Sequence, residues 1–160
     1  MKRNKIVVVL TALCLGAGTL WAADPNGKAA DNKIYAQTLV NALIKERSDL
    51  LIIGLHGVAP GAKDSAIIAC NLDHIGNLDS ADDLAAGIEH KTLLEPKSPE
   101  KFEIVMPLKD AAGAYIGAVV MIFKYRPADT ELGMYQKALT IRDELAKQIP
   151  DFAALFASSK

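Results

Sequence analysis

Residues 66–83 and 102–125 constrain the fold of this chain more than any other part of its sequence. The first segment starts with the apolar run Ala-Ile-Ile-Ala-Cys and then becomes an acidic loop that contains Gly76. The second has two apolar arms joined by Lys-Asp-Ala-Ala-Gly-Ala, whose Asp and Gly are typical of a turn. A strand, a long polar loop and a closing β-hairpin therefore predict a small antiparallel sheet with room for a ligand beside the loop.

An earlier hairpin and a short helix are predicted around this loop. Residues 50–56 are apolar and β-branched and too few for a helix, so we expect a buried strand that pairs with residues 66–72. Residues 80–89 are expected to form a helix, because Ser80 can cap its N-terminus and acidic side chains follow in the first turn.

Prolines and apolar patterning indicate where the later strands lie. Pro96 and Pro99 are expected to break the chain before the second hairpin, and Pro107 predicts that its first arm is near a sheet edge or ends there. Residues 116–123 are apolar on both faces, which is typical of a central strand. Gly117 in that strand is expected to let a neighbouring helix or a ligand approach closely.

Two longer helices flank the strands in the predicted order. Residues 31–47 and 130–149 both place apolar side chains at the spacing of a helix with one buried face, and Pro150 ends the second helix. The candidate N-caps are Asp31 or Asn32 for the first helix and Asp129 or Thr130 for the second. The predicted fold class is α+β: an antiparallel β-sheet with a long N-terminal helix, a helical loop and a C-terminal helix.

Residues 1–22 have the features of a signal peptide. Three basic side chains precede residues 6–15, an apolar run too short to span a bilayer comfortably. An uncleaved N-terminal anchor fits these flanks less well. We therefore expect cleavage after Ala22, export to a periplasm, and a single domain over residues 23–160.

Charge and cysteine content exclude several classes of function. The chain has 18 Lys and Arg and 19 Asp and Glu, and loss of three basic residues with the leader leaves a net charge of −4. A mildly acidic domain without a basic cluster is not expected to bind nucleic acid, and no membrane insertion is expected after leader cleavage. Cys70 is then alone in the sequence, so we predict a buried thiol and no intramolecular disulfide.

Four features of the sequence occur in an order that is also found in a known family of sensor domains. They are the leading helix, the strand end Ala-Cys-Asn-Leu-Asp-His-Ile-Gly at 69–76, the acidic Asp-Ser-Ala-Asp-Asp at 79–83, and the hairpin at 106–119. In this order they resemble single-module Cache domains, also called PDC domains, which are extracellular PAS-like sensors. The resemblance covers most of the expected mature chain. It implies a PAS-like sheet that senses a small ligand outside the cell. Such domains are coupled through a membrane helix to a kinase, cyclase or chemoreceptor, and neither that helix nor an output module is expected here.

The predicted ligand site lies between the concave face of the sheet and the helical loop. Asn71, Asp73 and His74 at a strand end, Tyr115 at the start of the last strand, and Tyr35 on the leading helix are placed to line it. Asp73 could pair with an amine, while Asn71 and Tyr115 could orient a polar group. His74 stands where similar sequences are expected to have Arg, so an anion-binding role is not carried over to it. The alternative left open is that Asp73 closes the loop and Tyr115 is a half-buried strand aromatic.

The sequence supports metal binding and catalysis less well than it supports ligand binding. Asp73 and His74, with the acids at 79, 82 and 83, could supply metal ligands, but adjacent acids on a loop are usually solvated or capping. Cys70 and His74 resemble a thiol–imidazole pair, yet along a strand they would be about 13 Å apart. His56 closes an apolar strand and is expected to be a satisfied core or loop-contact histidine. No metal, cofactor or enzymatic activity is predicted.

The predicted function is that of an exported periplasmic module that binds a small ligand of the amine, amino acid or carboxylate class. Its expected partners are that ligand and either a membrane-bound receptor or a second copy of the chain. The alternative is an interaction or assembly module whose pocket is filled by its own side chains, and a thiol- or histidine-dependent enzyme ranks third. A cavity that reaches Asp73 and Tyr115 would favour ligand binding. A core closed by Met106, Met121 and Phe123 would favour assembly.

Overall fold

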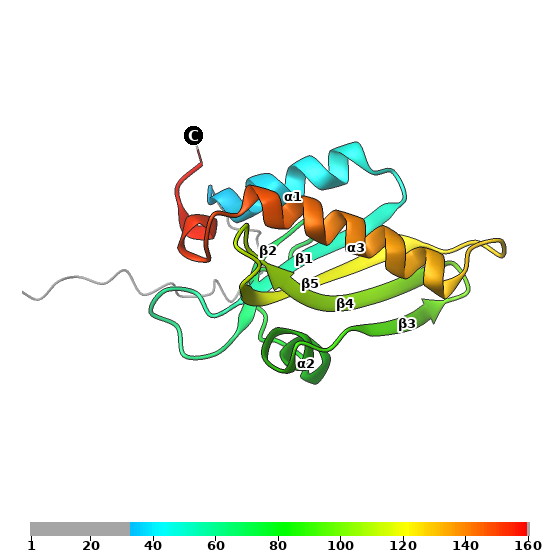
Figure 1. Ribbon diagram of the computed structural model, residues 1–160, viewed down its shortest axis with the longest axis horizontal. Helices are drawn as coiled ribbons and strands as arrows, with labels where there is room; N and C mark the ends of the chain where they lie inside the picture. Colours follow the sequence, from blue (N-terminus) through cyan, green and yellow to red (C-terminus); the bar gives the residue numbers. More distant parts are fainter. Residues whose placement is uncertain (1–32, 160) are drawn as a thin grey trace, which may run out of the picture.

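The computed structural model describes residues 33–159 (Figure 1). The predicted signal peptide and the proposed caps Asp31 and Asn32 lie outside these residues. The elements in chain order are α1 (Tyr35–Glu46), β1 (Leu50–Gly57), β2 (Ala66–Cys70), α2 (Ala81–Glu89), β3 (Leu93–Ser98), β4 (Lys101–Lys109), β5 (Tyr115–Lys124), α3 (Glu131–Gln148) and the short 3-10 helix η1 (Ala153–Phe156). Among them no helix has the length and apolar character needed to cross a membrane.

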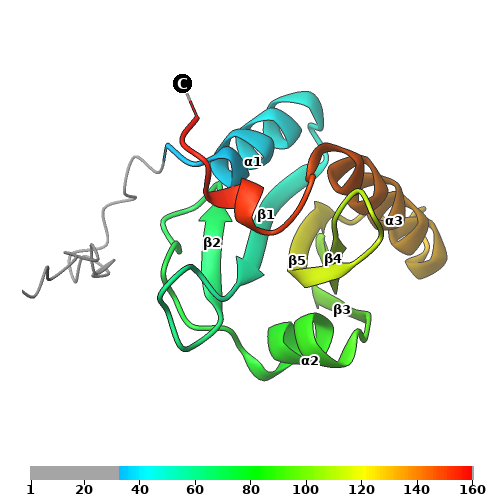
Figure 2. The same ribbon diagram turned by 60° about the vertical axis from the view of Figure 1, so that its left-hand side comes forward.

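The strands form one antiparallel sheet in the order β2-β1-β5-β4-β3. Helices α1 and α3 cover one face of the sheet, and α2 lies against the other face (Figures 1 and 2). The predicted α+β class and both predicted hairpins, β1–β2 and β4–β5, are therefore confirmed.

Strand β5 lies between β1 and β4, so the predicted central strand is confirmed. Val119, Met121 and Phe123 point into the main core that α1 and α3 close. Ala118 and Val120 alternate with them and pack in a smaller cluster with Ala86 of α2, on the opposite face. The two-sided apolar pattern of β5 thus reflects helices on both faces of the sheet.

Strand β3 was missed because its sequence contains Pro96 and is largely exposed. It is an edge strand, and proline is tolerated there because no further strand needs its missing N–H group. Pro107 in β4 pairs with Ala118 of β5 and lies beyond Val105, where the pairing with β3 ends. At Pro107, strand β4 therefore has a partner on one side only, as the expected position near a sheet edge requires.

The ends of the helices agree only partly with the predicted caps. Ser80 caps α2 and Thr130 caps α3 through side-chain oxygens, as expected, whereas Asp129 binds Arg126 instead. The N-cap of α1 is Ile34, which has no side-chain cap. The C-terminal tail takes over that role, since the N–H of Tyr35 donates to the carbonyl of residue 157 over 2.8 Å.

Candidate functional site

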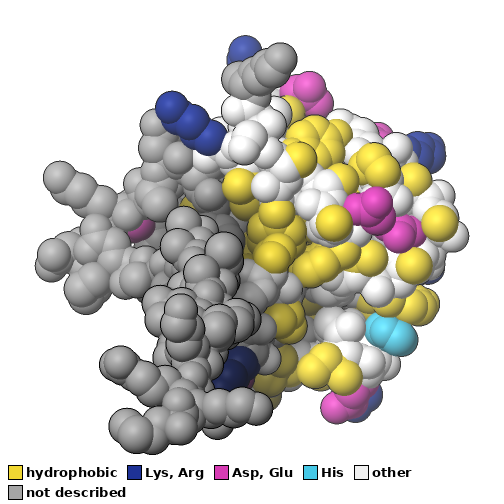
Figure 3. Space-filling model, turned by 90° about the vertical axis from the view of Figure 1, so that its left-hand side faces the viewer, with side chains coloured by type: hydrophobic (Ala, Val, Ile, Leu, Met, Phe, Trp, Pro, Cys, Tyr) yellow, Lys and Arg dark blue, Asp and Glu magenta, His cyan; other side chains and the backbone are white. Residues whose placement is uncertain are grey.

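A pocket of about 390 Å³ lies between α2 and the ends of β1 and β5. Its walls are mainly apolar and include Val58 from the β1–β2 loop, Leu84 and Ile88 from α2, Ile116 from β5 and Phe152 from the tail. Figure 3 views the molecule from this end and shows a broad group of apolar side chains on the surface. A concave, largely apolar site with a few polar groups is the usual form of a small-molecule site.

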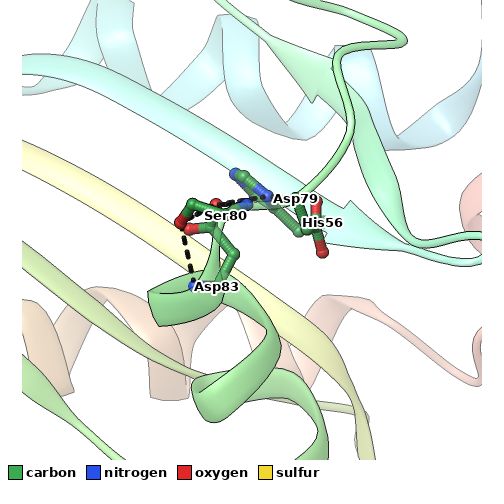
Figure 4. A network of polar contacts seen from close by, with 4 residues as sticks. All are labelled: His56, Asp79, Ser80 and Asp83. Atoms are coloured by element: carbon green, nitrogen blue, oxygen red, sulfur yellow. Dashed lines mark hydrogen bonds and ion pairs between the residues drawn. The ribbon is translucent and has the colours of Figure 1, made fainter.

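The polar part of this region is a buried cluster of His56, Asp79 and Asp83 (Figure 4). The Nδ1 atom of His56 lies 2.8 Å from Oδ1 of Asp79 and 3.8 Å from Oδ2 of Asp83. Because an ionised carboxylate can only accept, the 2.8 Å contact has Nδ1 of His56 donating to Asp79. The side chains of His56 and Asp79 are only 4% and 2% exposed. Both carboxylates, Asp79 and Asp83, line the pocket.

The position of His56 follows from the alternation of β1. Leu55 points into the core beneath α1 and α3, so the next side chain points to the face that carries α2. The ring extends back over Gly54, where an added Cβ atom would lie 3.0 Å from Nε2 of His56. The absence of a side chain at Gly54 therefore leaves the room in which the imidazole lies.

Asp79 is brought to His56 by the path of the loop after β2. The loop turns back beside the strand, with the N–H of Ile67 donating to the carbonyl of Asn77 and that of Gly76 to the carbonyl of Ile67. The N–H of Asp79 then donates to the carbonyl of Ser65 over 3.1 Å. This pairing places the Asp79 carboxylate beside the imidazole.

Asp83 is oriented by the N-terminus of α2. Its Oδ2 atom accepts from the backbone N–H and the hydroxyl of Ser80 at 2.8 and 2.7 Å, and the Ser80 hydroxyl lies 3.3 Å from the N–H of Asp83. This reciprocal capping box satisfies free N–H groups of the first turn and also aims Asp83 at His56.

Tyr115 is the predicted site residue that the structure places at the pocket. Tyr115 is 47% exposed as a residue, and its ring stacks on His90 with ring centroids 3.8 Å apart. The ammonium group of Lys109 lies 4.8 Å from the centre of the Tyr115 ring. Tyr115 thus forms an aromatic rim at the entrance.

Asn71, Asp73 and His74 do not line the pocket, contrary to the sequence-based expectation. Strand β2 ends at Cys70, and the Asn71 amide then continues its pairing with β1, accepting from Ile53 N–H at 2.8 Å and donating to the carbonyl of Leu51 at 3.0 Å. Asp73 and His74 follow on the exposed side of the loop. Asn71 is therefore a structural residue here.

Tyr35 is also remote from the pocket, because α1 covers the other face of the sheet. Its hydroxyl donates to the backbone carbonyl of Gln148 over 2.9 Å, which joins the start of α1 to the end of α3. Tyr35, which the sequence analysis placed at the ligand site, therefore does not lie at this pocket, and its ring packs against the main core.

The sequence analysis considered each member of the buried cluster separately but did not place His56 together with Asp79 and Asp83. His56 is a buried, hydrogen-bonded histidine, as expected, but its partners are Asp79 and Asp83, which were interpreted as loop and capping residues. The Ser80-Xaa-Xaa-Asp83 capping signal was present in the sequence. Nothing local signalled that this cap would meet His56.

Two chemical alternatives can be examined on this geometry. One ligand atom from each of His56, Asp79 and Asp83 lies within 4.8 Å of the others, so these residues form a possible metal-binding set. For the thiol alternative, burial raises the pKa of Cys70, and its Sγ atom accepts from the N–H of Leu72. A thiolate nucleophile is disfavoured in that position.

Comparisons with known proteins identify the class of fold. No family model matches the chain, and no curated protein matches it. A protein described as a GAF sensor, from Burkholderia vietnamiensis, is similar in structure with a TM-score of 0.52, 14% identity and coverage of 74% of this chain and 76% of that chain. The chain therefore has an α+β fold similar to GAF/PAS-like domains. This is consistent with the PAS-like part of the predicted resemblance.

Two other solved structures are more weakly similar. The inducer-binding domain of the PobR transcription factor from Acinetobacter, a double mutant with 3-hydroxybenzoic acid, gives a TM-score of 0.48 at 12% identity and covers 72% of this chain and 95% of that chain. A type II free methionine-R-sulfoxide reductase from Thermoplasma acidophilum gives 0.46 at 15% identity, with 71% and 87% covered. At these identities the similarity concerns the fold.

Proposed function

We propose that this protein is an exported sensory or binding module that takes a small organic molecule into the pocket beneath α2. The observation that carries the proposal is the pocket itself, in which apolar walls converge on two buried carboxylates. Its volume of about 390 Å³ is within the range of small-molecule sites. The Burkholderia protein with a similar fold is described as a sensor, which supports the same role.

The ligand classes proposed from the sequence are amines, amino acids and carboxylates, and membership of the Cache family is part of the same proposal. The contacts differ from those first expected. Asp79 and Asp83 take the place of Asp73, and Tyr115 is retained at the rim. A membrane-bound receptor or a second copy of the chain is the proposed protein partner.

The cavity supports ligand binding over the alternative of an assembly module whose pocket is filled by its own side chains. Met106, Met121 and Phe123 are fully buried, but they fill the core beneath α1 and α3 rather than the space beneath α2. The pocket reaches Tyr115, although it does not reach Asp73. The packing thus favours a module with an open site.

Filling the pocket is expected to abolish ligand binding without unfolding the protein. Leu84 is 38% exposed and lines the pocket, so Leu84→Trp should occupy it at small cost to the free energy of unfolding. A ligand bound only by the native state at a hundredfold excess over Kd stabilises it by about 2.7 kcal/mol, which a thermal-shift screen of small molecules detects.

The matched control is Leu132→Trp, at an exposed leucine in the first turn of α3 outside the pocket. It should respond to every active compound as the wild type does. A broad screen in which no compound shifts the wild type, or in which Leu84→Trp keeps the full shift, would contradict binding in this pocket.

Export is proposed from the leader sequence and is tested separately. If residues 1–22 are removed on secretion, the protein recovered from a bacterial periplasm should begin at Ala23, or one residue later. Intact mass measurement of the periplasmic and membrane fractions checks this. An intact Met1 terminus in the membrane fraction would instead indicate an anchored protein.

A further inference from the structure

The floor of the pocket holds two carboxylates beside a single imidazole, that of His56. Asp79 and Asp83 both line the cavity, with side chains that are 2% and 12% exposed. No lysine or arginine is among the described lining residues. If both carboxylates are ionised, a protonated His56 would leave one negative charge and a neutral one would leave two. Lys109 and His90 lie against the Tyr115 ring at the rim.

Each carboxylate uses one oxygen for contacts within the protein. Asp79 accepts from His56 through Oδ1, and Asp83 accepts from Ser80 through Oδ2. Within residues 33–159, Oδ2 of Asp79 and Oδ1 of Asp83 have no hydrogen bond. Neither oxygen is a fully buried atom without a partner, since among the described residues only Nε of Arg47 is. Both oxygens are therefore accessible to a charged donor from a ligand, which would form a strong hydrogen bond there.

We infer that the ligand is an organic amine, whose ammonium group donates to these two oxygens while an apolar body lies against the walls of the pocket. This inference rests on the proposed function and narrows its ligand classes. A simple carboxylate would bring a third negative charge to the floor, which like-charge repulsion opposes. The apolar walls formed by Val58, Leu84 and Ile88 suit an aryl or alkyl group.

A divalent metal ion fits the same residues less well. A metal ion bound at Nδ1 of His56 would replace the 2.8 Å hydrogen bond between this atom and Asp79. Oδ2 of Asp83 already accepts from two groups of Ser80. An ammonium group uses the two remaining oxygens and leaves these contacts intact.

The test is isothermal titration of the full chain with phenethylamine, phenethyl alcohol and hydrocinnamate, which share an aryl body and differ in charge. The amine should bind to the wild type, and the alcohol and the acid should bind at least about tenfold more weakly, since loss of a charged hydrogen bond corresponds to about a tenfold to hundredfold change in Kd. Asp79→Asn keeps the shape of the side chain and should weaken amine binding by a similar factor.

Asp82→Asn is the matched control, because it removes the same charge one residue before Asp83 from an exposed side chain that does not line the pocket. Its Kd for the amine should stay within about twofold of wild type. Near-ultraviolet circular dichroism reports whether Asp79→Asn is folded. If it is not, Asp83→Asn is used in its place with the same expected loss.

The possible outcomes separate this inference from the proposed function. Equal or tighter binding of the alcohol or the acid, blocked by Leu84→Trp, would overturn the amine assignment and keep the pocket as the site. Loss of amine binding in Asp73→Asn but not in Asp79→Asn would return the site to the exposed loop. A stabilising shift with Zn²⁺ alone, absent in Asp79→Asn, would make the cluster a metal site. If no compound binds in this set or in the broad screen, both proposals fail.

Discussion

Replacing Gly117 with alanine is expected to lower the free energy of unfolding by at least about 3 kcal/mol. A Cβ atom at this position would lie 2.1 Å from the carbonyl oxygen of His56, which belongs to the backbone of the neighbouring strand and cannot move aside cheaply. The φ angle of Gly117 is +146°, a conformation that residues with a side chain rarely adopt. Gly117→Val should be worse still.

Chemical denaturation of the wild type and both variants measures this effect. Gly113→Ala is the matched control, because Gly113 also has a positive φ of +83° but nothing within 4 Å of an added Cβ atom. Gly113→Ala should lower the free energy of unfolding by about 1–2 kcal/mol, because it carries the conformational cost of a positive φ but no steric clash. Equal losses at the two positions would show that β1 and β5 do not approach each other as described.

Replacing His56 with alanine is expected to cost about 3 kcal/mol of unfolding free energy. The imidazole donates to Asp79 and lies 3.8 Å from Asp83, and both carboxylates are largely shielded from water. Removing the imidazole therefore leaves the Asp79 carboxylate buried without its hydrogen-bond donor. The cost therefore reflects an unpaired buried carboxylate more than the loss of apolar contacts. Urea denaturation of the single variant measures it.

A double-mutant cycle tests the reason for that loss. Removing the partner as well, in His56→Ala with Asp79→Ala, leaves no unpaired carboxylate at position 79, so the double variant should be less destabilised than the sum of the two single variants by about 1 kcal/mol or more. Strict additivity of the free energies would mean that His56 and Asp79 do not interact in the native state.

Much of the fold could be predicted from the sequence because the relevant signals are local. The apolar character of both faces over residues 116–123 predicted the central strand, and the Asp and Gly of residues 109–114 predicted the turn before it. Ser80 and Thr130 were recognised as caps because a cap acts on N–H groups only two or three residues away. Interactions of such short range are encoded in short stretches of sequence.

The missed or misplaced features depend on distant parts of the chain. Strand β3 exists because β4 offers it a partner, although Pro96 argues against a strand in isolation. The start of α1 is determined by the C-terminal tail, whose residue 157 accepts from Tyr35. Neither partner could be inferred from residues near the element itself, since its position is set by packing of the whole domain.

The candidate site shows most clearly the difference between what local sequence encodes and what depends on distant parts of the chain. By itself the sequence determined that an acidic loop and a capped helix follow β2, and that His56 ends a buried strand. Only the tertiary structure brought His56 within 2.8 Å of Asp79, 23 residues later, and left Asp73 exposed. The physical reason is that the return of the loop along β2 depends on hydrogen bonds between backbone groups. Every residue type except proline can form such hydrogen bonds, so the side chains of the sequence do not reveal them.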